Sequence, residues 1–287
     1  MIKPTVIITG ANGFIGECLL KHFHDLGWKI KALVHKEPSE VYSNAEYILY
    51  NIEEKPDEKL FIGGDYLVHC AYLRYEKNKN ADELNVNGTR SLIELCRKHN
   101  IKPLFLSSFS AHSGAESHYG ITKLACEKLF DLSKDIVLKT GFVIGKKGLF
   151  GEMKNRILNS KYFPLVGGGN QPIQTVYIDD LCYIIENSLL ENRSGLFKVA
   201  EPEAISMKEF YLAIAEQENK KLKFISVSSP LLLLTCRTGE LFGIKLPVSS
   251  DSVLGLKHLI KFDTKEDLSK LGVTVRNYKQ SLEALKK

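Results

Sequence analysis

The sequence predicts an α/β fold, in which a doubly wound parallel sheet is joined to a smaller C-terminal α/β subdomain. Short apolar strands alternate with amphipathic helical stretches through the first half of the chain, a rhythm typical of βαβ crossovers. The rhythm breaks after residue 139, in a region punctuated by glycine as far as Gly167-Gly168-Gly169. This change indicates a second unit woven into the end of the first.

The elements of the first half follow from this alternation. Strands are expected at residues 5–9, 30–34, 47–50, 66–70, 103–107 and 136–139. Amphipathic stretches at 15–26, 84–99 and 119–132 predict helices between them. Right-handed crossovers through such helices build a parallel doubly wound sheet.

The second half returns to the sheet and also forms the subdomain. A helix is expected at 181–190 and a strand at 196–199, and Ser206 with Glu209 makes a capping box that opens another helix. We therefore expect a sheet domain at 1–150, to which 176–195 return, and a subdomain formed by 151–175 and 196–287.

The composition describes an ordinary globular protein. Hydrophobic residues make up 44% of the 287 residues and charged residues 25%, which excludes a disordered or fibrous chain. The net charge of +5 is mild, and basic residues are interleaved with acids along the chain. A nucleic-acid partner is therefore not expected.

Cysteine usage and apolar runs favour the cytoplasm. The six cysteines lie 26 to 56 residues apart, without a CxxC pair or metal-ligand spacing, so we expect reduced thiols and no metal site. The first residues do not resemble a signal peptide, and the longest apolar run, 230–234, is too short to cross a bilayer. That run is interpreted as core, or as the wall of an apolar substrate pocket.

A glycine motif, Thr9-Gly10-Ala11-Asn12-Gly13-Phe14-Ile15-Gly16, lies where the first strand turns into the first helix. Gly10 permits the tight turn, Gly13 lets backbone amides approach a pyrophosphate, and Gly16 allows close packing of helix on sheet. The motif and its context predict a dinucleotide-binding Rossmann domain, with the cofactor phosphates at the helix N-terminus. The alternative is a glycine turn that holds no ligand.

A second signal is Tyr119-Gly120-Ile121-Thr122-Lys123, which places a phenol and an ammonium one helical turn apart. A tyrosine has a pKa near ~10, so it needs a nearby cation to act as an acid or base at neutral pH. Upstream, Ser107-Ser108-Phe109-Ser110 ends a predicted strand and adds hydroxyl groups that could orient a carbonyl. The alternative is a chance pair on an amphipathic helix.

Together these residues resemble the extended short-chain dehydrogenase/reductase family, whose members are often called NAD-dependent epimerase/dehydratases. The similarity extends over nearly the whole chain, at 9–16, 68–71, 85–89, 107–108, 119–123, 169–171 and 177–181. It implies that Tyr119 is the catalytic acid/base and that Ser108 bonds the reacting oxygen. It also implies that Lys123 holds the nicotinamide ribose and lowers the pKa of the tyrosine.

The glycine motif, the ends of the next strands and the resemblance together define an expected cofactor site. Asn51 and Ile52 look like the adenine contacts of the family. The site comprises Gly10, Asn12, Gly13, Phe14, Ile15, Gly16, His35, Lys36, Asn51, Ile52, Cys70, Ala71, Tyr72, Ser107, Tyr119, Lys123, Thr140, Gly141, Phe142 and Val143. The histidines His22, His24 and His69 are assigned structural rather than metal-binding roles.

The chain departs from the family pattern at several positions. Lys139-Thr140 stand where the family usually has Arg-Pro, and only 11 positions separate Ser108 from Tyr119. Dehydratases resemble one another in an acidic pair directly after the catalytic hydroxyl, and here Phe109-Ser110 stand in its place. Sugar dehydration is therefore not expected.

The second strand ends at Val34-His35-Lys36, where NAD-preferring relatives commonly carry an acid for the ribose hydroxyls. Cationic or neutral donors suit a 2′-phosphate better, so NADP is the favoured cofactor and NAD stays possible. The alternative for His35 and Lys36 is an exposed, solvated turn with no ligand.

The leading functional hypothesis is a nucleotide-sugar 4-keto reductase or 4-epimerase that uses Ser108, Tyr119 and Lys123. One alternative is a reductase of a hydrophobic carbonyl such as a steroid or isoprenoid, and another is a non-catalytic NAD(P)-binding subunit or sensor. A small-molecule substrate is expected, without a membrane partner. The helices at 84–99 and 119–132 resemble those that pair in family dimers, so a homodimer is possible.

One position argues against a typical nucleotide-sugar site. Many such members carry an arginine that clamps the substrate diphosphate, and the corresponding residue here is Ile173, which has no guanidinium fork. Lys257, His258 or Lys261 would have to replace it. We therefore expect weak binding of nucleoside diphosphates and an apolar pocket, lined partly by 163–166 and 231–234.

Overall fold

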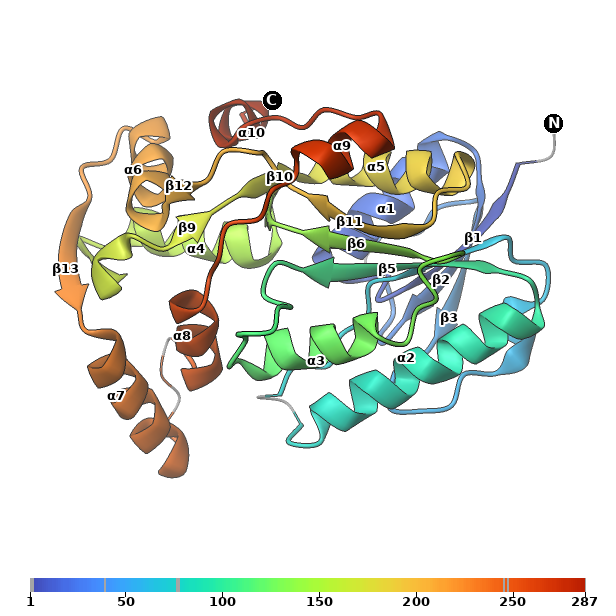
Figure 1. Cartoon of the computed structure of the whole chain (residues 1–287), viewed down its shortest axis with the longest axis horizontal. Coiled ribbons are helices and arrows are strands. Elements are labelled where there is room, and N and C mark those ends of the chain that lie inside the picture. Colours follow the sequence, from blue (N-terminus) through green and yellow to red (C-terminus); the bar gives the residue numbers. More distant parts are fainter. Residues whose placement is uncertain (1–2, 39, 76–77, 245, 247, 287) are drawn as a thin grey trace.

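The computed structural model describes residues 3–38, 40–75, 78–244, 246 and 248–286. Within these residues, seven parallel strands form one central sheet in the order β11-β6-β5-β4-β1-β2-β3 (Figure 1). The strands are β1 (Thr5–Thr9), β2 (Lys29–Val34), β3 (Ala45–Leu49), β4 (Tyr66–His69), β5 (Lys102–Ser108), β6 (Ile136–Thr140) and β11 (Gly195–Val199). The predicted doubly wound parallel sheet is confirmed.

Helices cover both faces of this sheet. On one side lie α1 (Phe14–Asp25) and α5 (Ile178–Leu190), and on the other lie α2 (Ala81–Lys98) and α3 (His118–Glu127) (Figure 1). A short 3-10 helix, η1 (Glu58–Phe61), precedes β4. The strand order reverses between β1 and β4, and in such sheets ligands bind outside the carboxyl ends of the strands at this switch point.

Burial on both faces explains why the strands are continuous apolar runs. Val6, Ile7 and Ile8 of β1 are all fully buried, as are Ile136 and Val137 of β6, since helices cover the sheet on either side. The helices present one apolar stripe each, so they need only one buried face.

A smaller lobe is built from the middle and late parts of the chain (Figure 1). Its core helix, α6, begins with the predicted capping box of Ser206 and Glu209. Short strand pairs join β8 to β13, β9 to β12 and β7 to β10. The elements are β7 (Phe142–Ile144), α4 (Gly148–Asn159), β8 (Tyr162–Val166), η2 (Gly167–Gly169), β9 (Pro172–Ile173), β10 (Thr175–Tyr177), β12 (Ile205–Ser206), α6 (Met207–Gln217), β13 (Lys223–Val227), α7 (Ser229–Leu241) and α8 (Ser250–Lys257).

The segment that returns to the sheet domain, expected at residues 176–195, extends further along the chain. β11 pairs in parallel with β6 from Gly195 to Val199, so the returning segment reaches Val199. The last two helices are α9 (Lys265–Leu271) and α10 (Tyr278–Ala284), of which α9 returns to the sheet domain and α10 stays with the smaller lobe. α9 packs on β11 and α5, whereas α10 bridges α6 and β10 (Figure 1).

The leucine run after Pro230 is not core. It forms the start of α7, a peripheral helix that packs mainly on α8 (Figure 1). Leu231 is 62% exposed and Leu234 60% exposed, while Cys236 and Gly239 on the opposite face are buried. All six cysteines are free thiols. Among the helices of the described residues, none combines the length and apolar character needed to cross a bilayer.

Candidate active site

The glycine turn after β1 is shaped by close backbone contacts. Gly10 has a φ of +66°, and a Cβ there would lie 2.8 Å from the backbone nitrogen of Ala71. A Cβ on Gly16 would lie 2.7 Å from the Cα of Ala11. These two positions therefore exclude any side chain, because the turn folds back on itself and on the end of β4.

The loop leaves one buried polar atom without a protein partner. The side-chain nitrogen Nδ2 of Asn12 donates to the carbonyl oxygen of Lys36 over 3.1 Å. The Oδ1 atom of Asn12 is buried and has no hydrogen-bond partner among the described residues. Gly13 is the N-cap of α1, and no side chain caps this helix. The first backbone amides of α1 have no capping partner, so they suit the phosphates of a dinucleotide. The free Asn12 Oδ1 atom suits a hydrogen-bond donor of the same ligand.

The ends of β2 and β3 lie next to this loop. His35 and Lys36 are exposed, directly after β2. The Asn51 amide is turned toward Glu53, to which it donates over 2.8 Å. Ile52 is buried, and a Cβ on Gly88 of α2 would lie 2.5 Å from its Cγ1 atom.

Tyr119 is placed by the first turn of α3. The Ser117 hydroxyl caps this helix by accepting from the Gly120 amide over 3.1 Å. Burial raises the pKa of the Tyr119 phenol, whereas a hydrogen bond from Ser108 and the charge of Arg74 act to lower the same pKa. The structure therefore joins Ser108 and Tyr119, as expected, at the carboxyl end of β5.

Lys123 has a different set of contacts from those expected. The residue is 4% exposed, and its ammonium donates to the Leu106 carbonyl oxygen over 2.7 Å. It lies 5.4 Å above the ring of Tyr72, and that ring in turn meets the Tyr119 ring edge-on at 5.0 Å. Burial lowers the pKa of Lys123 to about 8. Arg74, rather than Lys123, is the cation whose charge lowers the pKa of Tyr119.

His69 has the structural role expected of it. Its imidazole is buried between the hydroxyl oxygens of Thr9 and Thr89, at 2.7 Å and 3.0 Å. Thr89 donates to the Asn85 carbonyl, and the Ala71 amide donates to Thr9. Burial lowers the pKa of His69 to about 3, so the neutral ring links β1, β4 and α2.

Behind Ser108 lies a buried ion pair. The Lys139 ammonium is 3.1 Å from the Glu127 carboxylate and donates to the Ala111 carbonyl oxygen over 2.6 Å. Glu127 also accepts a hydrogen bond from the Ser107 hydroxyl, next to Ser108. Lys139 thus takes the place of the usual arginine and connects β6 to α3 and to the loop after β5.

The remaining positions that we expect to contact the cofactor follow the same edge of the sheet. Cys70, Ala71 and Tyr72 continue from β4, and the Thr140 hydroxyl donates to the Ser107 carbonyl over 3.1 Å. Gly141 and Val143 continue toward and into β7. Two side chains of the expected set are used in packing: Phe14 lies against Gly148, and Phe142 meets the Phe210 ring at 5.8 Å.

The residues expected to contact the substrate are placed only in part as predicted. Ile173 is buried in β9, and Lys257 and His258 are both beside Glu116, at 3.7 Å and 3.0 Å. Lys261 is exposed. Phe163 and Leu165 belong to the core of the smaller lobe, whereas Leu231 and Leu234 face outward on α7.

The sequence did not predict that Tyr72 and Arg74 would lie near Tyr119. Tyr72 was expected to touch the cofactor, but its ring also lies between Tyr119 and Lys123. Arg74 follows it in the same loop. The sequence signal for Arg74 was its place just after the fourth strand, where the carboxyl edge begins.

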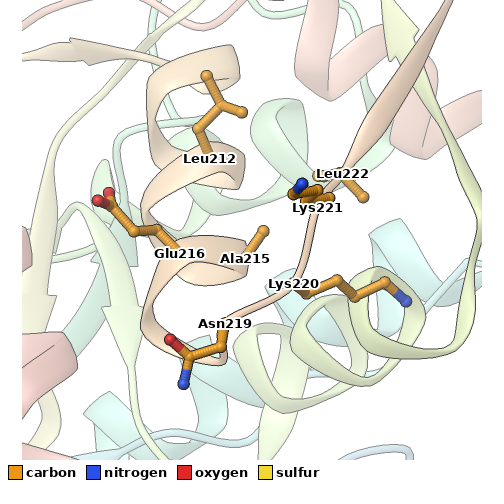
Figure 2. A pocket seen from close by; sticks show the side chains of 7 residues that line it. All are labelled: Leu212, Ala215, Glu216, Asn219, Lys220, Lys221 and Leu222. Carbon is orange, nitrogen blue, oxygen red and sulfur yellow. The ribbon is translucent and has the colours of Figure 1, made fainter.

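One surface hollow lies in the smaller lobe. It has a volume of about 570 Å³ and lies between the end of α6 and the segment that leads into β13 (Figure 2). Lys220, Lys221 and Glu216 stand at its rim beside apolar side chains of Leu212, Ala215 and Leu222 (Figure 2). The Lys220 ammonium also donates to the Leu158 carbonyl oxygen, which ties the hollow to α4 of the smaller lobe.

Comparison with known proteins gives the family. The chain is 20% identical to a decarboxylating sterol-4-alpha-carboxylate 3-dehydrogenase of Dictyostelium discoideum, over 98% of this chain and 99% of that protein. The solved structure of MoeE5 with UDP-glucuronic acid and NAD matches with a TM-score of 0.75 at 18% identity, covering 97% and 96% of the two chains.

A second solved structure matches almost as well. It is dTDP-4-dehydrorhamnose reductase from Bacillus anthracis in complex with NADP, with a TM-score of 0.71 and 19% identity over 99% and 98% of the chains. At these identities the structural matches establish the fold. The model of the NAD dependent epimerase/dehydratase family matches residues 6–196, and this chain belongs to that family.

Proposed function

We propose that this protein is an NAD(P)-dependent oxidoreductase that acts at C4 of a nucleotide sugar, as a 4-keto reductase or a 4-epimerase. The observation that carries the proposal is the contact between Ser108 and Tyr119 at the carboxyl edge of the sheet. This contact lies on the same edge as the glycine turn whose orphan acceptor fits a dinucleotide.

In this proposal the protein's own residues transfer a proton and orient the reacting oxygen. The nicotinamide, when bound, supplies or accepts a hydride at the carbinol carbon. In the reductive direction, Tyr119 gives its phenolic proton to the carbonyl oxygen, and the Ser108 hydroxyl steadies that oxygen. Lys123 lies 5.4 Å above the Tyr72 ring, and its hydrogen bond to the Leu106 carbonyl oxygen keeps it in place.

The test is Tyr119→Phe, which keeps the ring and removes only the proton donor. We expect cofactor affinity within about twofold of wild type and a fall in hydride transfer of roughly 10²-fold or more, in line with the loss of a general acid. Cofactor fluorescence titration and single-turnover absorbance should be measured on one preparation. Unchanged turnover in the variant contradicts the assignment and favours a non-catalytic cofactor-binding role.

A second candidate, reduction of an apolar carbonyl, is favoured by the buried Ile173 at the expected arginine position. The matched sterol dehydrogenase is also named for an apolar substrate. Calorimetry with UDP, TDP and GDP on cofactor-loaded protein separates the two candidates. Weak binding of all three would favour the apolar carbonyl, whereas micromolar affinity, about −8 kcal/mol, for any of the three would favour the nucleotide sugar.

A further inference from the structure

The loop after β4 is anchored over the catalytic tyrosine at two points. The Tyr72 ring meets the Tyr119 ring edge-on at 5.0 Å, and the Tyr75 ring stacks on the His118 imidazole at 3.7 Å. Both partners lie in the first turn of α3. The residues between Tyr72 and Tyr75 are therefore held against the same turn.

A buried amide fixes this loop from below. The Leu73 backbone nitrogen donates to the Asn85 Oδ1 atom over 2.9 Å, and the Asn85 amide donates to the Leu73 carbonyl oxygen over 2.8 Å. Asn85 is 1% exposed in α2. Arg74 is thus the exposed residue of a short segment whose other side chains and backbone are engaged.

Two acids, Asp82 and Asp251, are already engaged by residues of α3. One oxygen of Asp82 accepts from the Thr122 hydroxyl and the other contacts the His118 ring, both at 2.5 Å. Asp251 accepts from the His118 backbone amide over 2.5 Å. Among the described residues, Arg74 has no ion pair, whereas Arg97 and Arg276 are paired with Asp135 and Asp180.

Resting on the proposed function, we infer that Arg74 binds an oxyanion of the substrate close to the carbon that Tyr119 serves. A guanidinium presents a planar fork that matches carboxylate and phosphate oxygens, which makes it suited to this role. Lys79 adds a second cation at the loop, 4.2 Å above the Tyr75 ring. The charge of Arg74 reaches the reacting group, since it lowers the pKa of Tyr119.

The position of Arg74 favours one source of the oxyanion. Ile173, at the expected diphosphate clamp, lies in β9 of the smaller lobe, whereas Arg74 lies in the loop that touches Tyr119. An anion bound here is therefore near the reacting carbon, as a carboxylate on the sugar ring is. A diphosphate is the other source of the same chemistry, and the experiment separates them.

The experiment measures ligand affinity by calorimetry on cofactor-loaded protein, with UDP, UDP-glucose and UDP-glucuronate as probes. The variants are Arg74→Met, which keeps length and removes charge, Arg74→Lys, and Arg237→Met as a matched control on the exposed face of α7. We expect wild type and Arg237→Met to bind UDP-glucuronate at least tenfold more tightly than UDP-glucose. Arg74→Met should lose this difference, and Arg74→Lys should keep part of it.

Each other outcome has a stated meaning. An equal loss of affinity for all three probes in Arg74→Met supports anion binding and assigns the anion to the diphosphate. Unchanged affinities in Arg74→Met, or no binding of any probe to wild type, overturn the inference. The proposed function fails separately, if wild type binds neither NADH nor NADPH or if Tyr119→Phe turns over normally.

Discussion

At the residue scale, the neutral imidazole of His69 joins three elements beneath the active site. The Thr89 hydroxyl donates to the Asn85 carbonyl oxygen, so it accepts from Nε2 of His69. Nδ1 of His69 then has no proton and accepts from the Thr9 hydroxyl. Thr9 then accepts from the Ala71 amide, which starts the loop that carries Tyr72 and Arg74. A protonated His69 could not accept from Thr9, so the chain of bonds requires the neutral ring.

This arrangement predicts that the free energy of unfolding decreases in acid. The folded pKa of His69 is about 3, below its usual 6.5, so between these values the unfolded state binds more protons than the folded state. Stability should therefore fall as pH drops below about 6.5, by up to about 1.4 kcal/mol per pH unit from this group.

The measurement is urea unfolding at pH 7.5, 6.5, 5.5 and 4.5 for wild type and His69→Gln. The variant should be less stable at pH 7.5, because its amide cannot reproduce both bonds, but its stability should depend less on pH. Parallel pH curves for the two proteins would contradict the assignment of this slope to His69. His22→Gln serves as control, because that ring lies partly exposed beside Glu186.

A second residue-scale prediction concerns the cofactor. We expect NADPH to bind more tightly than NADH, because His35 and Lys36 are exposed at the end of β2 and the first acid, Glu37, follows them. Lys36→Ala should weaken NADPH binding by roughly tenfold, about 1.4 kcal/mol, and leave NADH binding unchanged. Lys29→Ala, at the other end of β2, is the control.

Fluorescence titration at two salt concentrations checks this prediction. A contact between Lys36 and a phosphate is screened by salt, so the NADPH preference of wild type should shrink as ionic strength rises. Equal affinities for the two cofactors, or a preference for NADH, would show that these side chains point away from the ribose.

At the scale of elements, a buried ion pair holds α3 against β6. Lys139 and Glu127 are both nearly inaccessible, and they also satisfy the Ala111 carbonyl and the Ser107 hydroxyl. Removing one member leaves the other charged and unpaired in the interior, whereas removing both replaces the pair with apolar packing. The pair therefore positions the segment that carries Ser108.

The prediction compares single and double variants. Glu127→Ala should lower the free energy of unfolding by about 3–5 kcal/mol, and Glu127→Leu combined with Lys139→Met should recover a large part of that loss. Urea unfolding followed by circular dichroism provides the values. A double variant as unstable as Glu127→Ala would mean that the hydrogen bonds to Ser107 and Ala111, rather than the unpaired charge, account for the cost.

At the scale of the whole molecule, the two lobes share one hydrophobic core. The same cluster of buried residues contains Leu138 of β6, Leu181 of α5, and Phe210 and Ile214 of α6. α9 packs on β11 and α5 of the sheet domain and α10 packs on α6 and β10 of the smaller lobe, so the end of the chain contacts both lobes (Figure 1). The lobes are therefore expected to unfold together.

Calorimetry tests this expectation directly. Wild type should show one transition whose calorimetric and van't Hoff enthalpies agree. Phe210→Ala should lower the midpoint of that single transition, with a loss of about 3–5 kcal/mol, although the residue lies in the smaller lobe. Two resolved transitions in either protein would show that the lobes are independent. The homodimer suggested by α2 and α3 stays a prediction, checked by light scattering on the same samples.

The sequence by itself determined the sheet, its flanking helices and the glycine turn. Strand β1 runs over the predicted residues 5–9, and the capping box of Ser206 begins α6 as expected. These features depend on local pattern: apolar runs, glycine at a turn with positive φ, and a cap with its partner three residues on. The same local order placed Tyr119 and Ser108 close to one carboxyl edge.

Only the tertiary structure decided which distant side chains meet. The pairing of β11 with β6, the exposure of Leu231 on α7, and the effect of the Arg74 charge on Tyr119 depend on chain segments far apart in sequence. A leucine run looks the same whether a neighbouring element covers it or not. Likewise, Asp82 and Asp251 are engaged by residues of α3, and no local pattern records that.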